Sequence, residues 1–342
     1  MLLLKIGPRK HHAPLSGGLA TPEPLRCGDE HVRLRRAWWN VVDKHHDESG
    51  SLTLNGDAPD AILQGIESPW EKSRSIVVIA VKSPALAEVA ARIAPLLGPN
   101  TLVLPAMNGV PWWFGAGVPA LESSRPGGAT LESIDPGGQI AAAIPLAQLI
   151  GCVVHASTRA SAPGLVEHKM GQGLILGEPA GSVSTRVQAL AGLLQRAGFE
   201  ATVSADVRRD IWYKLWGNMT MNPISAITGA TVDRVLDDPL ARGFCTAAMA
   251  EAAAVGARIG CAIKQTPEDR HQITRKLGAF KTSMLQDVEA GRNVELDALV
   301  TVVREIAQRV GVATPFIDAL LGLARVHARV HGLYPAEVAQ AA

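Results

Sequence analysis

The pattern of expected strands and helices changes near residue 205, and this change most constrains the fold of the chain. Between residues 75 and 203, apolar runs suited to buried strands alternate with segments suited to helices. After residue 205 no segment has the composition of a strand. We therefore expect an α/β domain at 1–205 followed by an all-helical domain at 206–342. A length of 342 residues also favours two domains.

The elements of the first domain follow from their residue types. The run 75–81 is β-branched almost throughout, as in a strand that is buried on both faces. Alternation of such strands with helices predicts a layered, largely parallel sheet. Strands are expected at 75–81, 101–106, 151–156, 174–176 and 199–203, and helices at 85–97, 139–149 and 184–197.

Long helical stretches are expected in the second domain, with glycine or proline in the breaks between them. Pro223 is expected to end or kink the first of these helices just after Asn222. The stretches cover 207–227, 240–259, 268–290, 294–310 and 316–330.

Charge and cysteine content argue against several classes of protein. The 33 basic side chains nearly balance the 32 acidic ones, which gives no electrostatic reason to expect nucleic acid or a membrane as a partner. The four cysteines are far apart in sequence, which argues against a disulfide framework and a structural zinc site. A cytoplasmic location fits this cysteine usage best, and no export signal is recognisable at the start. No metal site is expected.

Three polar side chains recur every four residues in the otherwise apolar stretch 212–223: Lys214, Asn218 and Asn222. At 3.6 residues per turn, this spacing places all three on one stripe of a helix. Burying an uncharged polar group without a partner costs on the order of 2–7 kcal/mol, so the stripe is expected to face a polar ligand. The alternative is a solvent-facing stripe on an amphipathic helix.

Four further positions are candidates for a site. Lys82 and Asn108 each follow an expected strand, where ligands bind in an open parallel sheet. A surface lysine and an Asn-Gly turn are the alternatives. Ser283 and Glu295 are candidates only in combination with the other motifs. For Glu295 the reason is that the helix dipole favours an acid in the first turn of a helix whatever its function.

Three ordered motifs together resemble those of the ketopantoate reductases (2-dehydropantoate 2-reductases), over roughly residues 75–330. They are Lys-Leu-x-x-Asn-x-x-x-Asn-Pro at 214–223, Thr-Ser-Met-Leu-Gln-Asp at 282–287 and Glu-Leu-Asp at 295–297. The resemblance implies a Rossmann-like NADP-binding domain and a helical domain similar to the C-terminal domain of 6-phosphogluconate dehydrogenase. It further implies NADPH-dependent reduction of a small 2-keto acid, 2-dehydropantoate to pantoate, in pantothenate and coenzyme A biosynthesis, and a homodimer through the helical domain.

The resemblance gives the polar stripe its roles. Lys214 matches the general acid, Asn218 and Asn222 match the asparagines of the substrate cleft, and Ser283 matches a serine near the substrate carboxylate. These residue types suit the chemistry. A hydride that reaches the C2 carbonyl builds negative charge on oxygen, which an ammonium can stabilise and protonate. The carboxamides can orient the substrate without adding charge.

The remaining matches concern the cofactor, and here the chain departs from the family. Glu295 matches a catalytic acid that touches substrate and cofactor, while Lys82 and Asn108 match cofactor-side residues, with Asn108 near the substrate too. Family members open with a strand, a Gly-x-Gly-x-x-Gly turn and a helix that bind the pyrophosphate. Residues 1–74 lack this turn and hold half of the ten histidines.

We interpret residues 1–74 as an out-of-frame or misassigned stretch that replaces the first strand, turn and helix. If the segment is instead genuine, the sheet lacks its central strand and phosphate turn, and the chain as written is expected to bind NADPH poorly or to fold poorly. Two alternatives to the reductase stay open at this point. One is a catalytically silent homologue that has lost cofactor binding, and the other is an opine-type dehydrogenase.

Overall fold

The computed structural model describes residues 2–6, 76–123, 128–162 and 165–336. The chain divides into two compact units. The first, called the α/β unit, comprises 1–81, 88–107 and 143–205. The second, called the helical unit, comprises 82–87, 108–142 and 206–342. The helical unit thus includes two segments that directly follow strands of the α/β unit.

The described strands of the α/β unit form two sheets of three strands. In the first sheet β2 (Ile76–Ala80) lies between β1 (Leu2–Ile6), which is antiparallel to it, and β3 (Leu102–Pro105), which is parallel. In the second, β5 (Leu165–Gly177) lies between the antiparallel β4 (Gly151–Ala162) and the parallel β6 (Glu200–Val203). A bridge between Val103 and Leu149 connects the two sheets.

Parallel pairing therefore occurs at β2–β3 and β5–β6, whereas β4 and β5 form an antiparallel hairpin that we did not predict. The expectation of short strands at 151–156 and 174–176 was wrong in length, because the polar residues between them continue both strands. Only residues 163–164 separate β4 from β5, and a parallel crossover needs a dozen or more residues.

The core of the α/β unit lies between strands of both sheets and α6 (Thr185–Arg196). The buried residues of α6 are Val187, Leu190, Ala191 and Leu194, which share one helical face. Residues 83–148, which belong partly to each unit, also contain the helices α3 (Leu86–Arg92) and α5 (Gln139–Ala143), with 3-10 turns at Ser83–Ala85, Ala94–Leu96, Pro136–Gly138 and Leu146–Gln148.

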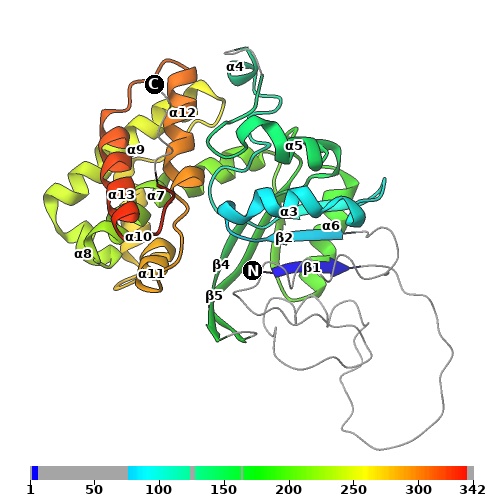
Figure 1. Cartoon of the computed structure of the whole chain (residues 1–342), viewed down its shortest axis with the longest axis horizontal. Coiled ribbons are helices and arrows are strands. Elements are labelled where there is room, and N and C mark those ends of the chain that lie inside the picture. The colour runs from blue at the N-terminus through cyan, green and yellow to red at the C-terminus, as the bar shows by residue number, and fades with distance from the viewer. Residues whose placement is uncertain (1, 7–75, 124–127, 163–164, 337–342) are drawn as a thin grey trace, which may run out of the picture. The chain divides into compact units, whose positions relative to one another are not determined.

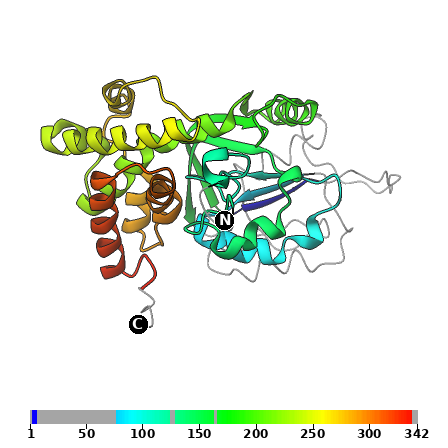
Figure 2. The same cartoon turned by 90° about the horizontal axis from the view of Figure 1, so that it is seen from above.

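The expected order of an α/β part followed by an all-helical part is confirmed. From residue 206 the described chain contains helices only (Figures 1 and 2, yellow-green to red). α7 packs against α9, α11 and α13. The elements are α7 (Val207–Thr228), α8 (Val232–Asp237), α9 (Pro239–Arg258), α10 (Pro267–Arg275), α11 (Ser283–Glu289), the π-helix η5 (Asp297–Thr301), α12 (Val302–Arg309) and α13 (Pro315–Val330), and the 108–142 segment adds α4 (Pro119–Glu122).

Two expectations for this part were wrong. The stretch 268–290 is not one helix, because α10 ends at Arg275 and Thr282 begins a new helix by accepting a hydrogen bond from the backbone N–H of Leu285. α7 does not end after Asn222 but continues through Pro223 to Thr228. A proline inside a helix costs roughly 3 kcal/mol, and the burial of residues 219–226 offsets this cost.

Two further features of the structure concern its helices and its cysteine side chains. None of the helices in the described ranges is long and apolar enough to cross a membrane. Cys152, Cys245 and Cys261 are buried and form no disulfide among the described residues. Burial raises the pKa of both Cys245 and Cys261 to about 12, so these thiols stay protonated and unreactive at neutral pH.

Candidate functional site

Lys214 and Asn108 meet within the helical unit, although 106 positions separate them in sequence. The ammonium of Lys214, on α7, donates a hydrogen bond of 2.7 Å to the Oδ1 atom of Asn108. The amide oxygen of Asn108 therefore orients the ammonium, while the amide nitrogen of the same side chain has no acceptor among the described residues.

The turn that carries Asn108 is docked on the π-helix η5. Gly109 has a φ of +80°, and a Cβ atom there would lie 2.3 Å from the carbonyl oxygen of Ala298. The backbone N–H of Val110 donates to that same oxygen at 2.8 Å. Only glycine allows this approach, so the Asn-Gly pair places Asn108 against η5 and is not the turn of a hairpin.

The other two members of the stripe on α7 differ in their surroundings. The Nδ2 atom of Asn222, which is buried, lies 3.5 Å from the Oγ atom of Ser283 at the start of α11. Asn218, between Lys214 and Asn222, is half-buried, and its carboxamide has no hydrogen-bond partner within the described ranges. Lys214 and Asn222 thus contact Asn108 and α11, while the carboxamide of Asn218 between them has no hydrogen-bond partner among the described residues.

Lys82 belongs to a buried ion pair. Its ammonium nitrogen is buried and paired with the Oδ2 atom of Asp287 on α11, although 42% of the side chain is exposed. Asp287, which is almost fully buried, also accepts from the Nε atom of Arg292 at 3.1 Å. Two cations therefore share one carboxylate, and Lys82 is not a free surface lysine.

Glu295 lies beside this ion pair and is buried. The backbone N–H of Ser83 donates to its Oε1 atom at 2.9 Å. Burial raises the pKa of Glu295 above its ordinary value, and the nearby Asp287 adds to this effect, while the Ser83 N–H and the Lys82 charge oppose it. The net result is a carboxyl group that holds its proton to higher pH than an exposed glutamate.

These contacts form a closed series around the site. Asn108 connects through Val110 and Ala298 to η5, which follows Glu295, and Glu295 connects through Ser83 to Lys82. Lys82 connects through Asp287 to α11, whose Ser283 contacts Asn222 on α7, the helix of Lys214. We call this series the site ring; it includes every residue expected at the site, with Asn218 in it as part of α7.

Sequence reasoning missed several members of the ring. Asp287 lies four residues after Ser283, so both project from one side of α11, and this spacing was a usable signal. The hydrogen bond from the backbone N–H of Ser83 to Glu295 could not be predicted, because a backbone donor does not depend on the type of side chain. The docking of Gly109 on Ala298 joins residues too far apart in sequence for any local pattern to show.

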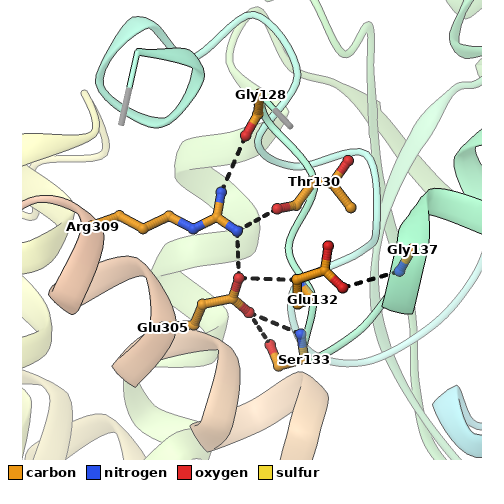
Figure 3. A network of polar contacts seen from close by, with 7 residues as sticks. All are labelled: Gly128, Thr130, Glu132, Ser133, Gly137, Glu305 and Arg309. Carbon is orange, nitrogen blue, oxygen red and sulfur yellow. Dashed lines mark hydrogen bonds and ion pairs between the residues drawn. The ribbon is translucent and has the colours of Figure 1, made fainter. Parts of the chain in front are cut away.

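A second polar cluster in the helical unit attaches the segment 128–137 to α12 (Figure 3). Glu305 accepts from the backbone N–H groups of Glu132 and Ser133, both at 2.9 Å, from the Ser133 hydroxyl at 2.6 Å and from Arg309 at 2.5 Å. Arg309, only 4% exposed, also donates to the carbonyls of Gly128 and Thr130. We call this cluster the Glu305 anchor.

Neither cluster contains a metal-ligand set, and no group of three potential ligands lies together within the described ranges. The residues that could contact a cofactor are Lys82, Asn108 and Glu295, which offer an ammonium, a carboxamide and a carboxyl group. The carboxamide and carboxyl suit the hydroxyl and amide groups of a ribose or a nicotinamide.

Comparison with known proteins gives matches along most of the chain. Residues 206–328 match the family model of the ketopantoate reductase PanE/ApbA C terminal, and residues 33–111 match that of ketopantoate reductase PanE/ApbA. The second match begins well before residue 75, from which we expected the resemblance to start. The interpretation of residues 1–74 as misassigned concerns mainly positions outside the described residues.

Individual relatives agree with these matches. The 2-dehydropantoate 2-reductase of Mesorhizobium japonicum is 42% identical over 264 residues, 77% of this chain and 79% of that protein. A crystal structure of a protein from Ralstonia solanacearum MolK2, described as a candidate ketopantoate reductase, is 55% identical with a TM-score of 0.72, covering 77% of this chain and 79% of that one. D-mandelate dehydrogenase, solved with NADH and anilino(oxo)acetate, shares the fold at 19% identity, with a TM-score of 0.64 and coverage of 78% and 80%.

Proposed function

Because the chain belongs to the ketopantoate reductase family of oxidoreductases, we propose that it reduces 2-dehydropantoate to pantoate with NADPH and that Lys214 is the general acid. The observation that carries the proposal is the hydrogen bond between Lys214 and Asn108 next to the unmatched amide of Asn218. An oriented ammonium beside a free amide suits a polar ligand such as a ketone.

The chemistry assigned to Lys214 follows from charge. When bound, the reduced nicotinamide supplies a hydride to the C2 carbon of the keto acid. Lys214 stabilises the negative charge that develops on the C2 oxygen and transfers a proton to it, which gives the alcohol. Asn108 keeps the ammonium directed at this oxygen, since its amide oxygen accepts one of the three N–H bonds.

Asn218 and the Asn222–Ser283 pair serve the rest of the substrate. The free amide of Asn218 donates to or accepts from the keto acid, and the Ser283 hydroxyl binds the carboxylate region. Asn222 orients that hydroxyl through the 3.5 Å contact. Glu295, held by the backbone N–H of Ser83, contacts both substrate and cofactor, and burial raises the pKa of its carboxyl group.

The cofactor assignment has two parts. Lys82, Asn108 and Glu295 fit the ribose and nicotinamide half of a pyridine nucleotide, while the sequence holds no Gly-x-Gly-x-x-Gly turn for the pyrophosphate. NADP in preference to NAD is our proposal from the family. We assign cofactor binding to 1–205 and substrate binding and dimerisation to 206–342.

The homodimer is supported by an exposed apolar stripe on α13. Phe316, Leu323, Val326 and Val330 are 43%, 63%, 60% and 77% exposed and follow a helical spacing. Exposed apolar side chains grouped on one face favour association. The expected cytoplasmic location stays a prediction.

Cofactor oxidation at saturating 2-dehydropantoate tests the function. Wild-type protein is expected to oxidise NADPH faster than NADH. Fluorescence titration with NADPH, without substrate, is the companion measurement. Saturable binding and turnover support the proposal. Absence of both supports a silent homologue, and turnover that requires an amine co-substrate supports an opine-type dehydrogenase.

A further inference from the structure

A second cationic side chain packs against α7 beside the stripe of Lys214. The guanidinium carbon of Arg270, from α10, is 5.1 Å from the centre of the Tyr213 ring. A Cβ atom at Gly217 would lie 2.7 Å from Arg270 Nε and 3.1 Å from Nη2. The guanidinium therefore occupies the space left by the missing side chain of Gly217, one turn after Tyr213.

Among the described residues this guanidinium has no anionic partner. Its Nε atom is buried without a hydrogen-bond partner, and Arg270 forms no ion pair in the part of the chain that the structure describes. Arg275 on the same helix differs, because it pairs with Asp237 at 2.7 Å and donates to the carbonyl of Leu236 at 2.6 Å. An arginine held against a helix without an acceptor suits an oxygen that a ligand brings.

The position of Arg270 relative to the site follows from helix geometry. At 100° per residue, the order around α7 is Gly217, Lys214, Asn218 and Asn222, with steps of about 60°, 40° and 40°. Arg270 lies at Gly217, and Ser283 lies at Asn222. Lys214 and Asn218 therefore stand between a guanidinium on one side and the Ser283 hydroxyl on the other.

The order of these side chains around α7 favours one orientation of a bound 2-keto acid. With the ketone at Lys214 and the carboxylate toward Ser283, the substituent on the other side of the ketone extends toward Gly217 and Arg270. The Cβ positions of residues three apart on a helix are about 5–6 Å from each other, so two or three further carbon atoms span the distance.

We propose that Arg270 determines substrate specificity by binding an oxygen at the end of the substrate opposite its carboxylate. In 2-dehydropantoate this oxygen is the C4 hydroxyl, and in a dicarboxylic 2-keto acid it is the second carboxylate. The inference rests on the proposed function. It predicts that this protein discriminates against 2-keto acids whose far end is purely apolar.

Two matched pairs of compounds test the proposal. The first is 2-dehydropantoate and 3,3-dimethyl-2-oxobutanoate, which lacks only the hydroxyl; the second is 2-oxoglutarate and 2-oxopentanoate, which lacks the second carboxylate. Hydrogen bonds to charged groups contribute about 1.5–3 kcal/mol, so kcat/KM should favour the oxygen-bearing member of at least one pair by roughly 10- to 150-fold. The pair with the larger ratio identifies which oxygen is bound.

Arg270→Gln should reduce that ratio to near one, chiefly through KM, and leave the dissociation constant of NADPH unchanged. Arg270→Lys should restore part of it. Gly217→Ala, which displaces the guanidinium but suits a helix, should lower the ratio without lowering Tm. Arg275→Gln is the matched control on α10 and should keep the wild-type ratio.

An unchanged ratio in Arg270→Gln overturns the proposal, as does an equal loss for both members of a pair. Failure of the proposed function looks different, because the wild type would then reduce none of the four acids. In that case, calorimetric titration of the same pairs measures binding directly. Loss of the difference within a pair in Arg270→Gln supports the role of Arg270, and an unchanged difference contradicts it.

Discussion

The two polar clusters of the helical unit differ in how completely their polar groups are hydrogen-bonded. In the Glu305 anchor, the carboxylate accepts four hydrogen bonds and the buried arginine donates to two carbonyls and to that carboxylate. In the site ring, Asn218 has no partner within the described residues, and the pKa of Glu295 is raised by burial. In the anchor only the Nε atom of Arg309 lacks a partner among the described residues, and both charged groups of the pair are compensated. The comparison teaches that a cluster whose carboxylate and guanidinium neutralise each other stabilises the fold, while a cluster with an unpaired carboxamide keeps binding capacity for a ligand.

The largest expected effect on activity comes from a substitution of Lys214 in the site ring. Lys214→Ala removes the ammonium that stabilises and protonates the C2 oxygen, so kcat should fall by roughly 10²–10⁴. Steady-state NADPH oxidation measures it. Thermal unfolding should change little, because the Lys214 side chain is only half-buried. Lys264→Ala, an exposed lysine, is the control, and turnover of Lys214→Ala close to that of the control would remove Lys214 from the mechanism.

The largest expected effect on stability is in the anchor. Glu305→Ala leaves Arg309 buried without its counter-charge, which should lower the free energy of unfolding by about 3–5 kcal/mol. Urea denaturation measures the change. Glu289→Ala breaks an exposed ion pair with Lys281 and should cost at most about 1 kcal/mol. Equal losses in the two variants would contradict the distinction, as would a large loss of kcat in folded Glu305→Ala.

A change at Gly109 should affect both properties. Gly109→Ala puts a Cβ atom 2.3 Å from the Ala298 oxygen at a φ of +80°, so the free energy of unfolding should fall by about 1–3 kcal/mol. Turnover should fall too, because the displaced turn carries Asn108. Gly243→Ala in α9, where the added Cβ meets nothing within 4 Å, should be neutral or stabilising. Wild-type turnover in Gly109→Ala would show that the docking on η5 does not position Asn108.

The smallest expected effect concerns the pH dependence of stability. The pKa of Glu295 is raised in the folded state, so the wild type loses stability as pH rises from the ordinary value of 4.5 through the raised pKa. Each pKa unit corresponds to about 1.4 kcal/mol. Glu295→Gln does not titrate, so its stability relative to the wild type should increase between pH 4.5 and 8. Denaturation curves across that range measure it, and a relative stability that decreases with pH would contradict the burial of the carboxyl.

Regular periodicity explains which parts of the molecule the sequence predicted. The strand at β2, the helices α6, α7, α9 and α13, and the stripe of Lys214, Asn218 and Asn222 depend on residues close in sequence, where a period of two or 3.6 is visible. Pro223 shows the limit of this reasoning, because the local rule against an internal proline was outweighed by burial on both sides of it.

Contacts between distant segments account for the rest. The pairing of Lys82 with Asp287, the approach of Gly109 to Ala298 and the seat of Arg270 at Gly217 each join residues that no local pattern connects. The length of the β4–β5 hairpin was missed because polar residues in both strands hid the strand signal. The function-bearing residue types could be recognised one by one, but their mutual arrangement could not.

The double-mutant cycle of Asn108→Ala and Lys214→Ala, measured on kcat, tests the central claim most directly. If Asn108 acts by orienting the Lys214 ammonium, Asn108→Ala should slow the wild type but have little further effect once Lys214 is alanine, so the double variant should equal Lys214→Ala. If the two losses instead multiply fully in the double variant, the residues act independently, and the account of Lys214 as a proton donor held by Asn108 is wrong.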